Sequence, residues 1–173
     1  MAGVSNLPPR QGLYDPAFEH DACGVAMVAT LNKVSTHEIV TLALTALRNL
    51  EHRGASGAEL DSGDGAGILI RIPDRFFREI VNFDLPPAGS YVAGITFLST
   101  EEDLRPQIEA IAREEGLKIL GWRQLPVNSS SLGKTALSVM PRFEQIFLSG
   151  TFGESGLHLD RLAFCLRKRV EHA

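Results

Sequence analysis

The stretch CGVAMVAT, residues 23–30, is a short apolar run of strand length that begins with a cysteine and a glycine. Residues 1–22 precede it, carry three prolines and show no periodic pattern. Short apolar runs bounded by irregular chain are typical of buried strands. The change at Cys23 therefore divides an irregular leader from the folded part of the chain.

Cys23 has two interpretations on these residues alone. The first is a buried strand cysteine, because free cysteine is among the most buried residue types. The second is a nucleophile, since removal of residues 1–22 would free an α-amino group whose ordinary pKa of about 7.7–8.0 suits a general base. Gly24 would then leave room for a substrate near the backbone. Cys165, within the apolar run LAFCL, is expected to lie in the core.

Helix and strand patterns alternate along the rest of the chain. Ser35 or Thr36 is placed to cap a helix that carries one apolar face and ends near residues 51–54. Further helices are expected over 75–81, capped by Asp74, and from Thr100 to Gly116; strands are expected over 23–30, 68–72, 91–98, 118–125, 144–148 and 161–167, the last before a basic helical end. Strands outnumber helices in this scheme. The expected class is α+β, with helices packed over sheet.

A second candidate site is LEHRG, residues 50–54. His52 could act as a base, but a histidine at a helix end more often caps the helix or faces solvent. Arg53 could bind a substrate carboxylate through its bidentate guanidinium, or serve the structure alone. The residues themselves leave both alternatives open.

The loop after this motif is rich in glycine. Its spacing Gly63-x-Gly65-x-Gly67 leads into an expected strand and not a helix, so the dinucleotide-binding fingerprint fails. Asp61 and Asp64 have no cluster of histidine or cysteine beside them, and the rest of a calcium loop is absent. No metal site is therefore expected.

Charge and composition exclude several classes of function. The 173 residues carry a formal charge of −4, which argues against binding to nucleic acid. No apolar run reaches the roughly 18–20 residues of a membrane helix, and the N-terminus does not have the pattern of a secretory signal. Two cysteines in such a chain indicate a reducing compartment, so a cytoplasmic protein with free thiols is expected.

Several longer motifs are more specific. They are GLYDPAFEHDACGV at 12–25, NLEHRGA at 49–55, DSGDGAGI at 61–68, GWRQLPV at 121–127 and LRKR at 166–169. In this order they resemble the large subunit of the glutamate synthase family, over nearly the whole chain from Gly12 to His172. The resemblance favours the interpretation of Cys23 as a nucleophile.

The resemblance implies a fold and a division of the chain. It indicates a class II glutamine amidotransferase domain with the four-layer αββα fold of N-terminal-nucleophile hydrolases, incomplete in this chain. Residues 1–22 would be a leader cleaved before Cys23, and residues 23–173 the N-terminal part of the domain. Arg53 and Gly54 would lie beside the nucleophile and shape the substrate pocket, with structural bracing as the alternative.

The resemblance also implies an activity. The Cys23 thiolate would attack the side-chain amide of L-glutamine, release ammonia and form a γ-glutamyl thioester that water converts to glutamate. In the full-length enzyme the ammonia would pass to 2-oxoglutarate, with FMN, an iron–sulfur cluster and NADPH or ferredoxin as cofactors. None of these is expected in this chain. The implied partners are the remainder of the glutamate synthase chain and a small subunit.

The sequence departs from the family pattern at the oxyanion hole. The family motif there contains Asn-Gly, which this chain lacks, and the loops that hold the glutamine carboxylate and amine have no counterpart. Because one oxyanion-hole donor is worth about 2.7–4 kcal/mol, we expect the chain alone to be nearly inactive. Two alternatives stay open: another class II amidotransferase, such as that of purine synthesis, and a non-catalytic fragment that binds a partner. The leader and the loop at 61–67 favour glutamate synthase.

Overall fold

The structure, a computed structural model, describes residues 10–12, 24–32, 34–50 and 65–173. The chain divides into two compact units, Met1–Ile68, called unit 1, and Leu69–Ala173, called unit 2. Each unit has its own internal packing, and the two differ in content. Unit 1 contains one described helix, and unit 2 contains every other described element.

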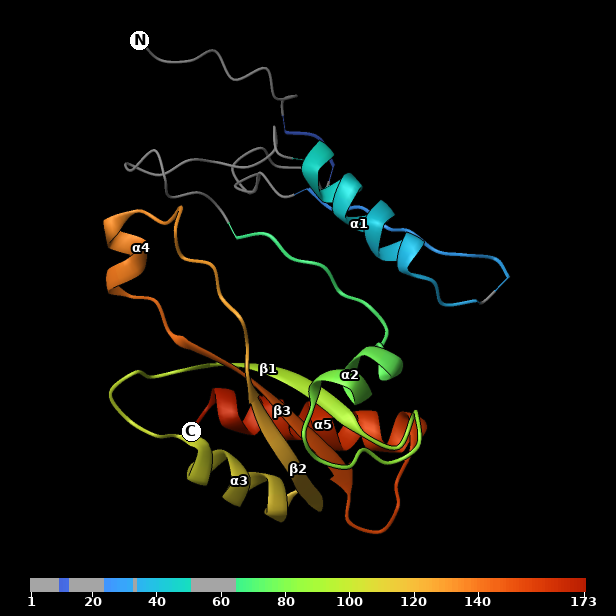
Figure 1. The fold of residues 1–173 in the computed structure, drawn as a ribbon, viewed down its shortest axis with the longest axis vertical. Coiled ribbons are helices and arrows are strands. Elements are labelled where there is room, and N and C mark those ends of the chain that lie inside the picture. The colour runs from blue at the N-terminus through green and yellow to red at the C-terminus, as the bar shows by residue number, and fades with distance from the viewer. Residues whose placement is uncertain (1–9, 13–23, 33, 51–64) are drawn as a thin grey trace. The chain divides into compact units, whose positions relative to one another are not determined.

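Five helices and three strands form in the described residues (Figure 1). In chain order they are α1 His37–Asn49, α2 Asp74–Ile80, β1 Val92–Leu98, α3 Arg105–Glu114, β2 Leu117–Gln124, α4 Lys134–Ser138, β3 Arg142–Gly150 and α5 Gly156–Glu171. The chain therefore mixes helices with antiparallel sheet, which confirms the α+β class. Helices outnumber strands among the described residues, so the expected excess of strands is wrong.

The three strands form one antiparallel sheet in the order β1-β3-β2. β3 is central because it pairs with β1 on one side, from Val92 opposite Leu148 to Leu98 opposite Arg142, and with β2 on the other. These are the strands predicted over 91–98, 144–148 and 118–125. Helix α3 links β1 to β2 and α5 follows β3, in the manner of a split βαβ motif.

One face of the sheet is covered by α3 and α5. The buried core on this face consists of Leu98, Ile108, Ala112, Leu117, Ile146, Leu148, Leu159 and Leu166. Ile108 and Ala112 are four residues apart, so they share one side of α3. The two helices are also joined by Arg169, whose Nη1 donates to Glu115 Oε1 at 2.8 Å. This core fixes the helix layer on the sheet.

The opposite face carries an aromatic cluster around Phe147 of β3, which is fully buried. The ring of Phe77 from α2 meets it edge-on, with centroids 5.1 Å apart and planes at 86°. The ring of Phe83 lies 5.4 Å from it, and Tyr91 packs against the same side chain. Edge-to-face pairs of this kind add to the stabilisation that burial provides.

A hydrogen-bonded cluster fastens α2 to the loop before β1. Asp74, expected as a helix cap, is instead the first residue of α2, and Pro73 is the N-cap. The Asp74 carboxylate accepts hydrogen bonds from Arg78 Nε at 2.9 Å and from the Tyr91 hydroxyl at 3.0 Å. Arg78 Nη1 in turn donates to the Leu85 carbonyl at 2.9 Å. Burial and the bond to Asp74 raise the pKa of Tyr91 to about 12.

Two predicted strands do not form. The described residues of 23–30, which are 24–30, and residues 68–72 have no regular secondary structure. Their apolar side chains lie exposed, with Val25 at 87% and Leu69 fully accessible. A strand needs a neighbour to satisfy its backbone groups, and the described residues provide none beside these segments. The strand prediction for them is wrong because pattern alone does not supply a partner.

The strand predicted over 161–167 is also wrong, because these residues belong to α5. Leu159, Leu162, Leu166 and Val170 recur at helical spacing and face the core. Cys165 falls between these positions and is exposed, which corrects its expected place in the core. None of the helices in the described ranges has the length and apolarity needed to cross a bilayer.

Helix ends follow local hydrogen bonding. Thr36 is the N-cap of α1, as predicted, although its side chain makes no capping bond. Helix α3 begins later than Thr100 because the Ser99 hydroxyl accepts the backbone N–H of Glu101 at 3.1 Å and forms a separate turn. Its predicted stop is confirmed, since Gly116 has a positive φ of 74°, which favours glycine.

Replacement of Phe147 tests the aromatic cluster. We expect Phe147→Ala to lower the free energy of unfolding by about 3–5 kcal/mol, because it removes a buried ring and leaves a cavity. Phe152→Ala is the matched control, since Phe152 is 90% exposed; its effect should stay within about 0.5 kcal/mol. Urea denaturation followed by circular dichroism measures both, and equal losses would contradict the assignment.

Candidate functional site

The residues selected for chemistry fall outside the described ranges. Cys23 lies in residues 13–23, and Arg53 and Gly54 lie in residues 51–64. The second range also contains His52, Asp61 and Asp64. Their roles therefore stay predictions, and the structure describes only the residues that flank them, Gly24 after the first range and Leu50 before the second.

Helix α1 leads to the second motif. Glu38 lies in its first turn and Arg48 in its last, each favourable with the helix dipole. The N–H of Leu50 donates to the Ala46 carbonyl at 3.2 Å. The helix therefore ends at Asn49, and its C-cap, Leu50, is the first residue of the motif LEHRG. None of the apolar face is fully buried, and Leu44 is 40% exposed, because the described part of unit 1 forms no strand for it to cover.

A turn reverses the chain between residues 24–30 and α1. The Asn32 side chain accepts the Val34 N–H at 3.0 Å, and the Thr30 hydroxyl donates to the Val34 carbonyl at 3.4 Å. Asparagine favours such turns because its side chain can take the place of a backbone acceptor. The extended segment spans roughly 23 Å and the helix about 20 Å. Because the two lengths match, the ends away from the turn, at Gly24 and at Leu50, come close to each other.

Gly24 and Leu50 are in contact at these far ends. A Cβ added at Gly24 would lie 3.1 Å from Leu50 Cδ2 and 3.3 Å from Leu50 Cβ, closer than most side-chain contacts. The absence of a side chain at Gly24 therefore permits the approach. The residue bonded to Cys23 packs against the residue that opens the motif containing Arg53. The sequence favours a glycine here for substrate access, whereas the structure shows that the missing side chain also permits close packing against Leu50.

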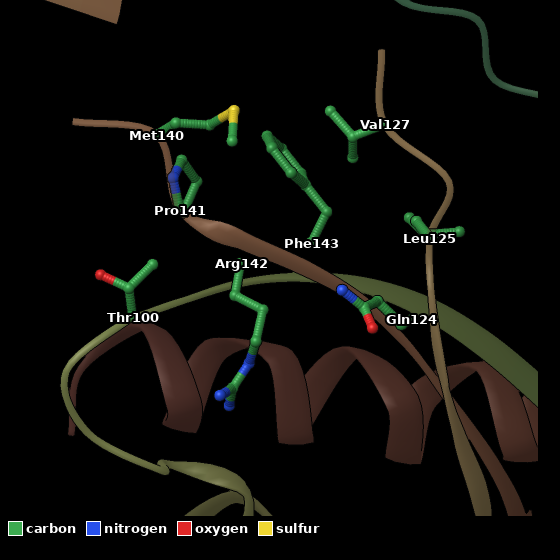
Figure 2. A pocket seen from close by; sticks show the side chains of 8 residues that line it. All are labelled: Thr100, Gln124, Leu125, Val127, Met140, Pro141, Arg142 and Phe143. Atoms are coloured by element: carbon green, nitrogen blue, oxygen red, sulfur yellow. The ribbon is translucent and has the colours of Figure 1, made fainter. Parts of the chain in front are cut away.

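Unit 2 has a shallow hollow of about 280 Å³ at one end of the sheet (Figure 2). It is lined by Thr100, Gln124, Leu125, Val127, Met140, Pro141, Arg142 and Phe143. Met140, Phe143 and Val127 point into the same region, whereas the Arg142 side chain turns away from them. The lining contains no cysteine, no histidine and no carboxylate, and its one hydroxyl, that of Thr100, has no base beside it, so we do not assign chemistry to this hollow.

Arg142 turns towards a charged cluster that the sequence did not reveal. Its Nε lies 2.9 Å from Oε1 of Glu144, whose carboxylate is buried on β3. Arg105 Nε and Nη2 donate to the two oxygens of Asp103 at 2.9 and 3.0 Å, and Arg142 Nη2 lies 3.4 Å from Asp103 Oδ1. The two arginines thus link one exposed and one buried carboxylate. This cluster fastens the start of α3 to the central strand.

Across residues 10–12, 24–32, 34–50 and 65–173, no cluster of three or more His, Cys, Asp or Glu side chains has a suitable arrangement to hold a metal. The carboxylates of the charged cluster are paired with arginine, which competes with any cation for their oxygens. The described residues therefore offer no metal centre.

Comparison with known families decides the assignment. A profile described as "Glutamine amidotransferases class-II" matches residues 23–173, which is most of the chain. The chain belongs to the class II glutamine amidotransferases. The match begins at residue 23, the position of the cysteine selected as nucleophile.

Individual relatives agree with this family. The chain is 41% identical to the glutamate synthase [NADPH] large chain of Bacillus subtilis, over 97% of this chain and 11% of that protein. It is 36% identical to ferredoxin-dependent glutamate synthase 1 of Arabidopsis thaliana, over 100% of this chain and 11% of that protein. It is 38% identical to glutamate synthase [NADH] of Schizosaccharomyces pombe, over 96% of this chain and 8% of that protein. The chain thus spans about a tenth of these relatives.

The contact between Gly24 and Leu50 can be tested by hydrogen exchange. We expect Gly24→Ala to speed amide exchange in residues 24–32, because its Cβ forces Leu50 to move. The double variant with Leu50→Ala should be less perturbed than the sum of the single variants predicts, since the larger side chain is removed. Gly67→Ala is the control, because a Cβ there meets nothing within 4 Å. Strict additivity would contradict a direct contact.

The charged cluster predicts a pH dependence. The hydrogen bond from Arg105 holds the pKa of Asp103 at about 2, below its ordinary value of 3.8. A lowered carboxyl pKa contributes stability that is present above pH 3.8 and is lost as the pH falls through about 2. Asp103→Asn should therefore destabilise the chain at neutral pH, with a deficit that disappears near pH 2.

Unfolding measured by urea at several pH values checks this expectation. Glu102→Gln is the matched control, since Glu102 is exposed beside Asp103 and makes no ion pair within the described residues. Its deficit should be small at every pH. A deficit for Asp103→Asn that is independent of pH would show that the ion pair is not its cause.

Proposed function

We propose that this chain carries the nucleophile of a glutamine-hydrolysing domain and that this nucleophile is Cys23. The observation that carries the proposal is the family match, which begins at residue 23. Residues 1–22 would then be a leader, and their removal would leave Cys23 as the first residue. A free α-amino group on the same residue supplies the base that the thiol needs.

The proposed reaction proceeds in two steps. The α-amino group of Cys23 takes the proton from the thiol, and Sγ attacks the side-chain amide carbon of L-glutamine. The tetrahedral intermediate collapses as the proton is delivered to the leaving nitrogen, which releases ammonia and forms a γ-glutamyl thioester. Water then adds to the thioester carbon, and the thiol leaves as glutamate is formed.

Arg53 and Gly54 are the proposed substrate-binding residues. The contact of Gly24 with Leu50 supports this, because Gly24 is bonded to Cys23 and Leu50 is the first residue of the motif that contains Arg53 and Gly54. An arginine beside the nucleophile would shape the floor of the substrate pocket, while the loops that hold the glutamine carboxylate and amine would come from elsewhere in the longer polypeptide. The chain contains no Asn-Gly dipeptide. We therefore propose that the oxyanion-hole donors come from elsewhere in the longer polypeptide.

We also propose that the sheet of unit 2 belongs to the four-layer αββα arrangement of N-terminal-nucleophile hydrolases, incomplete in residues 23–173. The support is the helix layer of α3 and α5 on one face of the sheet. On the other face, the side chains of Ile95 and Phe97 are 58% and 69% exposed. Such a face could receive a further layer.

The longer relatives suggest a wider function. Because the names of these relatives give NADPH, ferredoxin or NADH, we propose that the ammonia passes to 2-oxoglutarate in a full-length enzyme that uses one of these electron donors. The reducing compartment expected from the sequence favours a cytoplasmic location for that enzyme. FMN, an iron–sulfur cluster and a small subunit would belong to that assembly. An iron–sulfur cluster is usually held by four cysteine thiolates, and this chain has two cysteines. Its residues do not fit such a cluster, so that cofactor would be bound outside this chain.

The remaining alternatives are less well supported. A purine-pathway amidotransferase would share the nucleophile, but the relatives described above are glutamate synthases aligned over nearly the whole chain. A non-catalytic fragment that binds a partner would retain the fold without turnover. The low activity expected of the chain alone is compatible with that second alternative, so the test must report on Cys23 and not on turnover.

Labelling with a glutamine-like electrophile tests the nucleophile. Intact mass first establishes that residues 1–22 have been removed. We expect Cys23 to react at least about tenfold faster than Cys165, because an adjacent amine raises its thiolate fraction. Cys165 is exposed and therefore a demanding internal control, since burial does not protect it from the reagent.

Variants and competition complete the experiment. Cys23→Ala should abolish fast labelling, whereas Cys165→Ala should leave it unchanged. L-Glutamine should slow the labelling of Cys23 alone. Equal rates at the two cysteines in the processed chain would refute the assignment.

A further inference from the structure

The side chain of Leu50 supports the backbone next to the proposed nucleophile. A Cβ built on Gly24 has three nearest heavy atoms, and all three belong to the Leu50 side chain, at 3.1 to 3.3 Å. The Gly24 backbone therefore rests directly on this side chain. Among the described residues, no hydrogen bond ties Gly24 to another segment. Packing against Leu50 is thus what the described part of the chain offers to hold Gly24 in place.

Leu50 itself is fixed by helix α1. It is the C-cap of the helix, and its N–H donates to the carbonyls of Ala46 at 3.2 Å and of Leu47 at 3.1 Å. Its side chain is half-buried, at helical spacing from the half-buried Ala43, Ala46 and Leu47 on the same side of the helix. A side chain held by a helix positions its neighbours more precisely than one carried by a loop.

The contact limits where the nucleophile can lie. Consecutive Cα atoms are about 3.8 Å apart across a trans peptide bond, so whatever fixes the backbone of Gly24 also confines Cys23, which is bonded to it. Leu50 also opens the motif that contains Arg53. It therefore connects the two segments on which the proposed reaction depends, although its aliphatic side chain has no group that could take part in the chemistry.

We propose that Leu50 is a positioning residue for the nucleophile. Its side chain supports the Gly24 backbone and so directs the Cys23 thiol towards the amide carbon of glutamine. This inference rests on the proposed function, because it requires Cys23 to be the attacking group. A misplacement of about 1 Å can cost a reaction about a hundredfold in rate, so an aliphatic side chain can control the rate through geometry alone.

Removal of the Leu50 side chain tests the proposal. Leu50→Ala leaves a gap beneath Gly24, so the backbone there can shift. In the chain from which residues 1–22 have been removed, Cys23 reacts with the chloroketone analogue of L-glutamine when its thiolate displaces chloride. We expect the maximal rate of this reaction to fall about tenfold or more. The analogue concentration that gives half the maximal rate should change less than about threefold, because the groups that bind glutamine are retained.

Two further variants control for the loss of packing. Leu50→Met conserves volume and still reaches Gly24, so it should keep at least about half of the maximal rate. Ile39→Ala is the matched control, because it removes a half-buried aliphatic side chain at the opposite end of α1, roughly 16 Å along the helix axis. Its rate should stay within about twofold of that of the parent chain, since distant sites act independently.

A small electrophile separates position from activation. Iodoacetamide needs no substrate pocket, so its rate with Cys23 reports the thiolate fraction. The α-amino group that activates the thiol belongs to the same residue. Leu50→Ala should therefore leave the iodoacetamide rate and its pH dependence unchanged. Circular dichroism verifies that each variant keeps its helices; if Leu50→Ala unfolds, Leu50→Val removes one carbon and should show a loss of about threefold in the chloroketone rate.

Several results would overturn the proposal. The first is a chloroketone rate for Leu50→Ala equal to that of the parent chain. An equal loss in Ile39→Ala would show a general effect of helix packing, and a parallel loss with iodoacetamide would show an effect on the thiolate. A change confined to the half-saturating concentration would place Leu50 in substrate binding. Failure of the proposed function looks different: the parent chain would label Cys23 no faster than Cys165, and the inference would fall with it.

Discussion

Pairing of β3 on both sides is the constraint on which unit 2 depends. Because β3 is held between β1 and β2, its successive side chains must point to opposite faces of the sheet. Ile146 and Leu148 enter the core under α3 and α5, and Phe147 between them anchors the aromatic cluster. Three consecutive residues therefore serve two cores. Each helix layer is positioned by the same short piece of backbone.

The sequence predicted those parts of the fold whose signals are local. The three strands and helices α1, α2 and α3 were located because their apolar period and helix stops lie within a few residues, as at Gly116. The errors arose where two patterns compete. LAFCL in α5 is apolar enough for a strand, and only the longer spacing from Leu159 to Val170 shows a helix. Residues 24–30 had the right pattern but lacked a partner strand.

The candidate site was predictable to a different extent. The motifs around Cys23 and Arg53 are long enough to indicate the family from sequence, and the family comparison agrees. Contacts between distant residues were not predictable, because no local pattern encodes them. The approach of Gly24 to Leu50 and the pairing of Arg142 with Asp103 both belong to this class. The first connects the flanks of the two motifs, and the second braces the sheet.

The shared use of β3 has a consequence for how this family can vary in length. Insertion of one residue into β3 would exchange the faces of all later side chains, moving Phe147 or its neighbours into the wrong core. Natural insertions and deletions should therefore avoid β3. They should gather instead between β2 and β3, where residues 126–132 are mostly exposed. An alignment of relatives can be anchored on β3 for this reason, even where the surrounding loops differ.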